Sequence, residues 1–340
     1  MGGVTLRIVG AGLQATVQDL GRPHHQRDGV PGGGAMDRSA LRVGNALVGN
    51  DDGAAALEAT LVGPAIAFDD PTLIAITGGD LDATIDGQPT PMWRAMCVPP
   101  GATLRFGRPK AGCRAYVAVA GGIDVPLIFG SRSTYLRAHF GGHEGRPLRV
   151  GDVLRTQAPG PIARQIAALV RSGHDNGAVA VASWSAGHTL RMRYSSDPVV
   201  RLIAGAHAEL LAAPSRTKLF SASFNVSSSS DRMGYRLEGV ELPLRNPVEL
   251  LSEGVAFGTM QLPPDGMPII LMADRQTTGG YPRIGEVASV DLPLVAQLKP
   301  GDRLRFRPVS VDEAQQAYLL HEQDLAQARL AIALRHSRTK

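Results

Sequence analysis

The sequence predicts a mainly β fold of many short strands with only a few helices. Glycine (40) and proline (24) are abundant among the 340 residues, which favours tight turns between short strands. Short apolar runs bounded by Gly, Pro or Asp recur along the chain. A turn pattern with a Gly-x-x-Leu-Arg core also occurs at 100–106, 150–155 and 300–306, which suggests tandem related domains.

The first half of the chain contains five predicted strands and one helix. The strands are bounded by turn residues and lie at 6–9, 65–68, 72–77, 83–88 and 115–120. The fourth runs into an Asp-Gly pair, which is a strong hairpin signal. Between the first and second, apolar residues recur at near-helical spacing after Asp37, a candidate N-cap, so we expect a helix over 37–50.

The second half begins after a connector at 158–188, which has a short helical patch at 162–170. We therefore expect one β domain over 1–157, a second over 189–308, and a C-terminal helix with its tail over 309–340. Strands are predicted at 189–194, 199–204 and 269–273. The segment 311–335 is rich in Ala, Gln, Leu and Glu and indicates a helix, which we expect to dock on its own barrel rather than on a partner.

The charge pattern favours a protein with no nucleic-acid partner. The net charge is +4, but the basic residues are scattered, and no zinc-finger or RNA-binding signature is present. Arginine carries most of the positive charge, and it is the better clamp for carboxylates and phosphates. No apolar run reaches membrane-spanning length and no signal peptide precedes the first strand, so we expect a cytoplasmic protein.

Several common catalytic motifs are absent. The sequence has no phosphate loop, no dinucleotide fingerprint and no Gly-x-Ser-x-Gly nucleophile elbow. Two histidine pairs, His24–His25 and His139–His143, come closest to metal-ligand spacing, but neither has the glutamate of zinc hydrolases, so we expect no metal site. No Met-Lys-Met attachment sequence is present, so we expect no covalently attached biotin. Cys97 and Cys113 are too few for a disulfide framework.

Two polar clusters stand out in the first half. The segment 16–22 and the glycine-rich stretch 29–37 bring together Gln18, Asp19, Arg22 and Asp37, and glycines allow the backbone to approach a ligand closely. The alternative is a turn-rich loop without a ligand. The second cluster, at 121–135, follows an apolar strand and contains Ser131 and Arg132. This arginine could clamp a carboxylate or phosphate, or could tie down its loop by hydrogen bonds to carbonyls.

Two further clusters lie in the second half. A serine run at 227–230 precedes Asp231, Arg232 and Tyr235, which suggests a polar pocket wall, although adjacent Asp and Arg often form a local ion pair. The strongest cluster is 273–282, where a buried strand ends in polar residues and a Gly-Gly turn, an arrangement that holds a site on rigid support. Asp274 could be a general base or a partner for arginine, and threonine hydroxyls could donate to an oxyanion or amide. Its candidate side chains are Asp274, Gln276, Thr277, Thr278 and Tyr281.

Taken together, these motifs resemble the family of the 5-oxoprolinase C subunit, KipA and allophanate hydrolase subunit 2. They are also similar to one half of the carboxyltransferase domain of urea carboxylase. The matching stretches follow the family's order and cover most of residues 4–306: 16–22, 29–37, 45–50, 56–58, 121–135, 224–239, 252–261 and 273–282. The last three of these are the most specific.

The resemblance implies tandem cyclophilin-like β-barrel domains and a multi-subunit enzyme. The implied partners are a B-type companion, which is KipI-like or allophanate hydrolase subunit 1-like, and an A-type companion of the LamB/YcsF type. The complex would open 5-oxoproline to glutamate with ATP, which could be bound by or shared with a partner subunit. The implied catalytic residues are Asp274, Arg132, Gln276 and Thr277. Substrate contacts are implied for Gln18, Asp19, Arg22, Asp37, Ser131, Asp231, Arg232, Tyr235, Thr278 and Tyr281.

Two alternatives remain open. One is a carboxyltransferase component of a biotin-dependent, urea-type carboxylase or allophanate pathway, with the biotin on a separate carrier. The other is a KipA-like regulator that binds a KipI-like partner without catalysis. The missing biotin attachment sequence favours the oxoprolinase function over a self-contained carboxylase.

Overall fold

The computed structural model describes residues 3–172 and 177–337, with side chains in the last helix up to residue 334. It divides into two compact units: unit 1 comprises residues 1–21, 37–193 and 322–340, and unit 2 comprises 22–36 and 194–321. Residues 22–36, which the sequence analysis placed in the N-terminal domain, therefore pack with unit 2. The structure does not describe residues 1–2, 173–176 and 338–340. These residues belong, in that order, to the predicted N-terminal domain, the predicted connector and the predicted tail.

The predicted fold class is confirmed: both units are mainly β, with few helices and one long C-terminal helix. Unit 1 consists of two antiparallel six-stranded sheets. The first sheet contains, in order, β11 Val153–Arg155, β1 Thr5–Gly10, β4 Ala65–Phe68, β9 Thr103–Arg105, β6 Thr84–Ile85 and β7 Gln88–Pro89. The second contains β12 Ala180–Val181, β8 Ala95–Val98, β5 Thr72–Asp80, β10 Ala111–Val119, β3 Ala56–Thr60 and β2 Gln14–Gln18.

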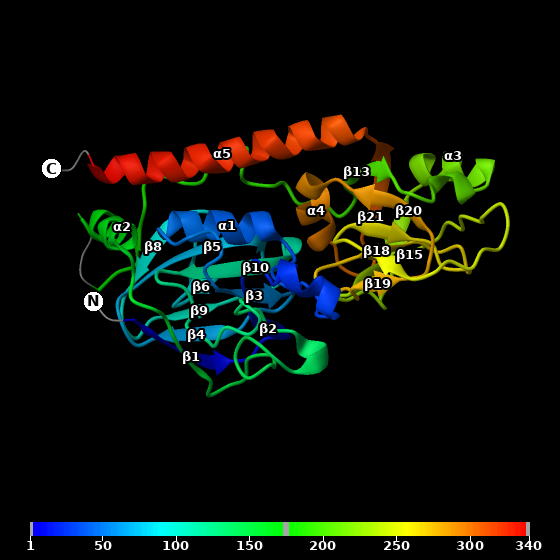
Figure 1. Cartoon of the computed structure of the whole chain (residues 1–340). Helices are drawn as coiled ribbons and strands as arrows, with labels where there is room; N and C mark the ends of the chain where they lie inside the picture. The colour runs from blue at the N-terminus through cyan, green and yellow to red at the C-terminus, as the bar shows by residue number, and fades with distance from the viewer. Residues whose placement is uncertain (1–2, 173–176, 338–340) are drawn as a thin grey trace. The chain divides into compact units, whose positions relative to one another are not determined.

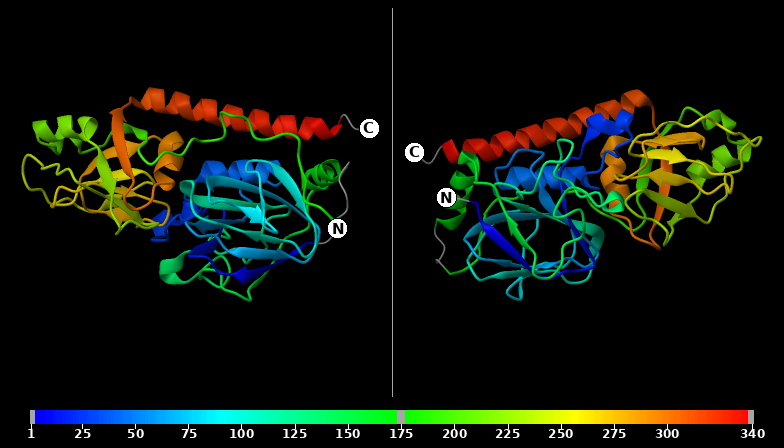
Figure 2. Two further views of the ribbon diagram at one scale, coloured as in Figure 1. Left: turned by 180° about the vertical axis from the view of Figure 1, so that it is seen from behind. Right: turned by 60° about the horizontal axis from the view of Figure 1, so that its bottom comes forward.

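The core of unit 1 lies between these two sheets (Figure 2). Alternate residues of each strand point inward, so that Leu6 and Ile8 of β1 meet Val117 and Val119 of β10 in one cluster, and all four are at most 1% exposed. This alternation of inward and outward positions is the ordinary consequence of the pleated strand. It leaves the opposite face of the second sheet available for a helix.

That face is covered by α1, Arg38–Leu47 (Figure 1). The helix begins at the predicted cap, because the Asp37 carboxylate accepts a hydrogen bond from the Ala40 N–H at 2.9 Å. It also lies unusually close to the sheet. A Cβ at Gly44 would stand 2.9 Å from Oγ1 of Thr77 and 3.2 Å from Cβ of Ala118, so only glycine permits this approach.

Unit 2 is built around a closed seven-stranded barrel. Its strands, in order around the barrel, are β13 Val199–Ala204, β20 Arg283–Val287, β17 Thr259–Gln261, β18 Ile269–Leu271, β15 Gly234–Glu238, β14 Phe224–Val226 and β21 Arg303–Pro308. A separate two-stranded sheet joins β16 Glu253–Gly254 to β19 Thr278–Gly279. Closure pairs β13 with β21 in parallel and β13 with β20 antiparallel, which removes the exposed strand edges that promote aggregation.

The remaining helices are short except for the last. They are α2 Pro161–Arg171, α3 Ala213–Ser221, α4 Leu292–Ala296 and α5 Val311–Ser337, with 3-10 turns η1 Pro23–Asp28, η2 Leu136–Ala138, η3 Ala208–Leu210 and η4 Ser289–Asp291. In unit 1, α5 is held by ion pairs: the Arg42 guanidinium contacts the Glu322 carboxylate at 2.5 and 2.8 Å, and Arg329 pairs with Asp52. Along the described chain, no helix is long and apolar enough to cross a membrane.

The repeated Gly-x-x-Leu-Arg pattern forms the same turn three times. Its glycines, Gly101, Gly151 and Gly301, have φ of 82°, 94° and 87°. Each glycine N–H donates to the carbonyl of a residue on a neighbouring strand. The N–H of that strand residue donates in turn to the carbonyl of the residue that follows the glycine. The strand residues are Phe68, Ile8 and Val226, at N···O distances of 2.7 to 3.1 Å. The leucines that follow are at most 2% exposed, so the pattern both turns the chain and anchors it.

Most predicted elements match the structure. The strands at 65–68 and 199–204 are found with the predicted bounds, and the C-terminal helix starts at the predicted residue. The predicted strand at 189–194 is wrong. The N–H groups of Leu190 and Arg191 both donate to the carbonyl of Gly187, at 3.1 and 3.2 Å, which forms a turn and leaves these groups unable to pair with a strand.

We predict that Gly301→Ala lowers the free energy of unfolding by about 1 kcal/mol or somewhat more, because alanine is strained at a positive φ. Urea denaturation measures this change. The control is Gly187→Ala, whose backbone lies outside the left-handed region and whose added Cβ would contact little. Equal effects of the two substitutions would contradict the role given to the turn.

A second prediction concerns Asp152, which follows the glycine of the middle turn. Its carboxylate accepts hydrogen bonds from the Arg146 guanidinium at 2.7 and 2.8 Å and from the Arg149 N–H at 2.7 Å. The Arg146 hydrogen bonds, followed by that of the Arg149 N–H, lower the pKa of Asp152 to about 2. Because the folded-state pKa lies below that of the unfolded chain, the stabilisation is present above about pH 4 and is lost as the pH falls towards 2.

Asp152→Asn should therefore lower the free energy of unfolding by roughly 1 kcal/mol at pH 7, allowing for solvent screening, and by much less near pH 2. Urea denaturation at the two pH values gives the comparison, with the exposed Asp51→Asn as control. A cost that is the same at both pH values would count against an ionic origin.

Candidate functional site

In unit 1, the Asp19 carboxylate is the centre of a buried polar cluster just after β2. Its Oδ1 accepts hydrogen bonds from the Ser131 and Ser133 hydroxyls at 2.6 and 2.5 Å and from the Gly21 N–H at 2.7 Å. Its Oδ2 accepts from the backbone N–H of Arg132 at 2.6 Å. A carboxylate with four donors can be buried in its charged form. Asp19 therefore fixes the 131–133 loop, and its oxygens are already engaged.

The side chain of Arg132 is presented by this fixed loop. It is 24% exposed, and Nη2 lies 3.8 Å from Oδ1 of Asp124. Its Nε is buried and has no hydrogen-bond partner among the described residues. A guanidinium on a rigid backbone, with donors to spare, suits a carboxylate or phosphate ligand.

Gln18 contributes an acceptor to the same cluster. Its Nε2 donates to Oγ1 of Thr16 at 3.0 Å and to the carbonyl of Thr134 at 3.2 Å. Its Oε1 is buried and finds no hydrogen-bond partner in the part of the chain that the structure describes. Because buried oxygens are nearly always paired, this atom is a place where a ligand N–H or a water would bind.

A row of polar side chains crosses the sheet face beneath α1. Strand register places Thr16, Glu58, Tyr116 and Thr77 side by side on β2, β3, β10 and β5. The Tyr116 hydroxyl donates to Oε2 of Glu58 at 2.7 Å and accepts the N–H of Asp37 at 2.8 Å. Burial raises the pKa of Tyr116 well above its ordinary value, and the charges of Glu58 and Asp37 raise it further. Tyr116 therefore stays protonated, as its donor role requires.

In unit 2, the central feature is a buried ion pair between Arg232 and Asp274. Nε and Nη2 of Arg232 lie 2.8 and 3.0 Å from the two carboxylate oxygens, and the Asp274 N–H donates to the Arg232 carbonyl at 2.8 Å. The two residues are 6% and 4% exposed. Nη2 also donates to the carbonyl of Gly34 at 2.6 Å. This two-pronged geometry is the strongest form of an arginine–carboxylate pair.

The glycine-rich segment 32–34 packs directly on this pair. The Gly33 N–H donates to the carbonyl of Ala273 at 3.1 Å, and the Arg22 N–H donates to the carbonyl of Gly32 at 2.7 Å. Gly33 has φ of 61°, and a Cβ there would lie 3.0 Å from Nη1 of Arg22. Gly33 is therefore needed to bring the Arg22 side chain and the Asp274 strand end together.

Gln26 ties η1 to the two-stranded sheet. Its Nε2 lies 2.9 Å from the carbonyls of both Val255 and Thr277. Val255 and Thr277 are themselves joined by a backbone hydrogen bond of 3.2 Å, and Nε of Arg275 donates to the Val255 carbonyl at 3.2 Å. One amide side chain thus holds the polar end of the 273–282 motif against the segment 22–36.

The other residues of that motif are less buried. Gln276 and Thr277 are half-buried, and Nε2 of Gln276 lies 3.4 Å from Oε1 of Gln261. Thr278 is exposed on β19, and Tyr281 is 46% exposed. These side chains are accessible to a ligand or partner, unlike Asp274.

Two predicted residues lie away from these contacts. Tyr235 is 2% exposed in the barrel core, where its hydroxyl donates to the Leu298 carbonyl at 3.1 Å. Asp231 forms a turn, its Oδ1 accepting the N–H of Met233 at 2.7 Å. The structure therefore gives both residues local structural contacts, and it pairs Arg232 with Asp274 rather than with its sequence neighbour Asp231.

Sequence reasoning missed three residues of interest. Ser133 completes the shell of Asp19, and its Ser-x-Ser spacing from Ser131 was the available signal. Gln26 carried no signal, because its partners lie more than 220 residues away. Glu286 on β20 accepts a hydrogen bond from the Thr259 hydroxyl at 2.8 Å. Burial raises its pKa, which that hydrogen bond opposes, and perturbed carboxyls cluster at functional sites.

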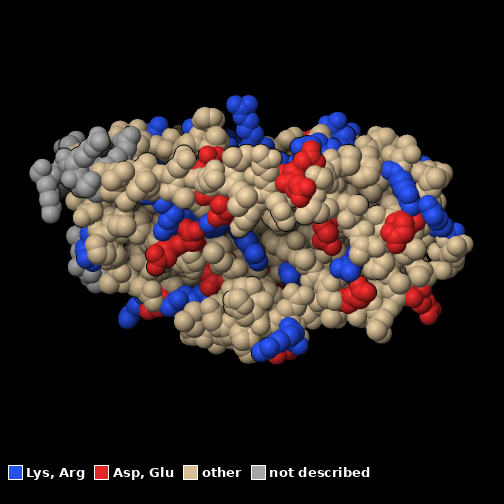
Figure 3. Space-filling view, turned by 45° about the horizontal axis from the view of Figure 1, so that its top comes forward, with Lys and Arg blue, Asp and Glu red and all other residues tan. Residues whose placement is uncertain are grey.

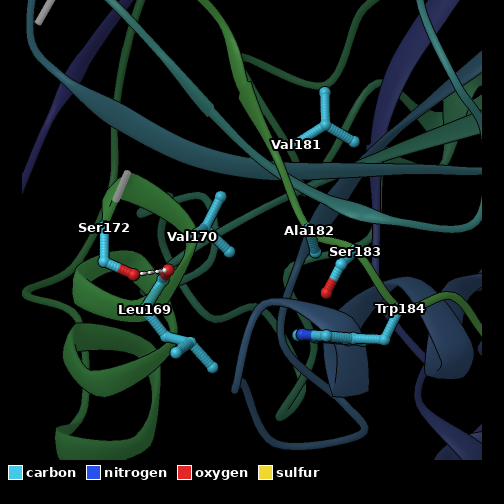
Figure 4. Close-up of a pocket in the computed structure, with 7 residues that line it drawn as sticks. All are labelled: Leu169, Val170, Ser172, Val181, Ala182, Ser183 and Trp184. Carbon is cyan, nitrogen blue, oxygen red and sulfur yellow. Dashed lines mark hydrogen bonds between the residues drawn. The ribbon is translucent and has the colours of Figure 1, made fainter. Parts of the chain in front are cut away.

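One pocket of unit 1, of about 410 Å³, contains none of the predicted site residues. It lies between the end of α2 and the strand that follows, and Figure 4 shows the Trp184 indole nitrogen and the Ser183 hydroxyl directed into it. Its remaining walls are mostly aliphatic. Separately, no three His, Cys, Asp or Glu side chains among the described residues are placed to hold a metal ion.

Comparison with known proteins identifies the family. The family model named "carboxyltransferase domain, subdomain A and B" matches residues 28–308 of the sequence. The chain therefore belongs to this family. It is 37% identical to the 5-oxoprolinase C subunit of Haemophilus influenzae over 306 residues, covering 88% of this chain and 90% of that protein. It is 38% identical to the 5-oxoprolinase C subunit of Escherichia coli over 322 residues, covering 92% and 94%.

A solved structure shows the same fold. The crystal structure of Kluyveromyces lactis urea carboxylase matches with a TM-score of 0.85 and 30% identity, over 96% of this chain. The match spans only 29% of that larger chain. The present chain therefore corresponds to one part of a longer protein in the urea carboxylase, and to nearly the whole length of the two oxoprolinase subunits.

We predict that removing one partner of the Arg232–Asp274 pair is far more damaging than removing both. Arg232→Ala should cost about 3–5 kcal/mol in the free energy of unfolding, because it removes a two-pronged, charge-assisted contact from a buried carboxylate. The double substitution Arg232→Met and Asp274→Leu should cost less than that single change. Urea denaturation of the set measures both.

The matched control is Arg305→Ala, which removes a more exposed pair with Asp197 in the same unit. Its cost should stay within about 1 kcal/mol. If Arg232→Ala cost no more than this control, the buried pair would have no special structural role.

Proposed function

We propose that this protein is the C subunit of an ATP-dependent 5-oxoprolinase, active as an amide-bond hydrolase only with its companion subunits. The observation that carries the proposal is the identity of 37–38% to two proteins named as the C subunit of 5-oxoprolinase, over nearly the whole of both chains. Such a name implies partners. We propose that these are a KipI-like, B-type companion and a LamB/YcsF-type, A-type companion.

The side chains available for this chemistry suit the proposed substrate. 5-Oxoproline carries a carboxylate and a ring amide, and hydrolysis breaks the ring C–N bond with addition of water. Arg132 presents a guanidinium for a carboxylate. Gln276 and Thr277 present an amide and a hydroxyl that can donate to an amide oxygen as negative charge develops on it. We propose Arg132 as the substrate contact of unit 1, and Gln276 and Thr277 as the candidate substrate contacts of unit 2.

Asp274 has a different proposed role. Its carboxylate is 4% exposed and bonded to Arg232, so it acts as a positioning residue for the end of β18 and for the segment 32–34. In the same way, the Asp19 carboxylate positions Arg132 by accepting a hydrogen bond from the backbone N–H of Arg132. ATP is proposed to be bound by or shared with a partner subunit, because this sequence has no phosphate loop.

A second candidate is a carboxyltransferase component for a urea-type substrate. The observation that favours it is the TM-score of 0.85 to a urea carboxylase, at 30% identity. Urea and 5-oxoproline both present an amide-like carbonyl, so the same donors could serve either reaction. Any biotin would then be carried by a separate chain.

We expect the complex reconstituted with both companions to release ADP in a 5-oxoproline-dependent manner and to form glutamate. Arg132→Ala should lower kcat/KM for 5-oxoproline at least tenfold, mainly through KM, since it removes a charge-assisted contact. Coupled ADP release and glutamate detection measure both products.

The control is Arg149→Ala, an exposed arginine of the same unit whose guanidinium makes no hydrogen bond within the described chain, and it should change kcat/KM less than twofold. Full turnover by Arg132→Ala would remove Arg132 from the site. If the wild-type complex used no ATP with 5-oxoproline, the oxoprolinase function itself would be wrong, and transfer from carboxybiotin to urea would be assayed next.

A further inference from the structure

Glu286 carries a carboxylate on the outer face of the unit 2 barrel. Strand register places it on β20 opposite Thr259 of β17. Met260, the next residue of β17, lies in the barrel core, so Thr259 and Gln261 on either side of it point outward. Glu286 is half-buried, whereas Thr259 and Gln261 are 0% and 1% exposed. These three side chains form an outer polar row on the barrel wall.

The 273–282 motif packs on this outer polar row. A Cβ at Gly279 would lie 2.4 Å from Nε2 of Gln261, so glycine is what allows β19 to approach β17 this closely. Oε1 of Gln261 lies 3.4 Å from Nε2 of Gln276. Gln276, a candidate substrate contact, is therefore held against the same row that contains Glu286. All of these residues belong to unit 2.

A short series of hydrogen bonds joins Glu286 to the backbone of Thr277. The Val255 N–H donates to the Thr277 carbonyl at 3.2 Å. The N–H of the next residue, Ala256, donates to Oγ1 of Thr259 at 3.0 Å. The Thr259 hydroxyl in turn donates its own proton to Oε2 of Glu286 at 2.8 Å. One oxygen of the carboxylate is thus fixed close to the motif that contains Gln276 and Thr277.

The other oxygen of Glu286 is available. Oε1 makes no hydrogen bond with residues 3–172 or 177–337. Burial raises the pKa of Glu286, and the Thr259 hydrogen bond and the charges of Arg283 and Arg275 oppose that rise. On the face drawn in Figure 3, acidic and basic side chains are interspersed without a broad patch of one sign, so we attribute the pKa to these nearby groups. A carboxylate with a raised pKa is a better proton acceptor.

Asp274 lacks such an available oxygen. Its two carboxylate oxygens lie 2.8 and 3.0 Å from Nε and Nη2 of Arg232, and the residue is 4% exposed. We infer that Glu286, rather than Asp274, is the general base of the proposed reaction, and that its Oε1 takes a proton from the water that attacks the ring carbonyl. This inference rests on the proposed oxoprolinase function.

The proton returns to the substrate within the same reaction. Glu286 accepts one proton as the water oxygen bonds to the ring carbonyl carbon, and the carbonyl electron pair moves onto its oxygen. Gln276 and Thr277 donate to that oxygen while it is negatively charged. When the C–N bond breaks, the ring nitrogen takes the proton from Glu286, which becomes ionised again. The step consumes 5-oxoproline and one water and produces the open-chain amino acid.

Glu286→Gln tests the inference in the complex reconstituted with both companions. The amide oxygen can still accept the Thr259 hydroxyl, but the side chain cannot take up a proton, so kcat should fall at least a hundredfold with little change in KM. Glu286→Asp keeps a carboxylate and should retain more of kcat. The control is Glu238→Gln, an exposed glutamate on β15 of the same barrel, which should change kcat less than twofold. Circular dichroism checks the fold of each variant.

The pH profile separates a base from a carboxylate that only supports the fold. The wild-type kcat should fall at acid pH as Glu286 becomes protonated. Thr259→Val should move that fall to higher pH, because the hydrogen bond that lowers the pKa of Glu286 is lost. The residual kcat of Glu286→Gln should not show it. A Glu286→Gln complex with the wild-type kcat, or with the wild-type acid limb, overturns the inference and leaves the proposed function standing. A wild-type complex that does not hydrolyse 5-oxoproline with ATP overturns both.

Discussion

A charged side chain can be buried only when its hydrogen-bonding groups are occupied. Each of the two candidate sites is organised around its own buried carboxylate. Asp274 is held by Arg232, and Asp19 is held by two serine hydroxyls and two backbone N–H groups. Each carboxylate joins segments that are far apart in sequence. The loops carrying Arg132 and the 273–282 motif are thus stiff, which is a condition for aligning a substrate.

The same constraint explains which parts of the molecule could be predicted from sequence. Local signals were sufficient for the Asp37 cap, the strand 199–204 and the glycine turns, because the sequence pattern that marks each of them spans only a few positions. The site contacts are of another kind. Asp19 and Ser131 are 112 residues apart, and Arg232 and Asp274 are 42 apart. No periodicity or turn pattern reports on such pairs.

Some candidate residues fitted their motifs and yet have ordinary structural surroundings. Tyr235 lies on a strand where alternate residues enter the barrel core, and its hydroxyl needs a carbonyl partner once it is buried. Sequence motifs of a family therefore mix residues that shape the fold with residues that can meet a ligand. Exposure separates them here: Arg132, Thr278 and Tyr281 are accessible, whereas Asp19, Asp274 and Tyr235 are not.

The assignment of residues 22–36 to unit 2 has a consequence for biosynthesis. The chain passes between the two units after residues 21, 36, 193 and 321, so neither unit is a single continuous segment. On the ribosome, residues 22–36 are made about 160 residues before the rest of unit 2 begins. At roughly 5–20 residues per second, that is a delay of about 8 to 30 seconds. During this interval the Gly33 N–H and the Gly34 carbonyl lack their partners in the rest of unit 2, Ala273 and Arg232. A chaperone that shields short nascent segments would therefore benefit this protein more than one with contiguous domains.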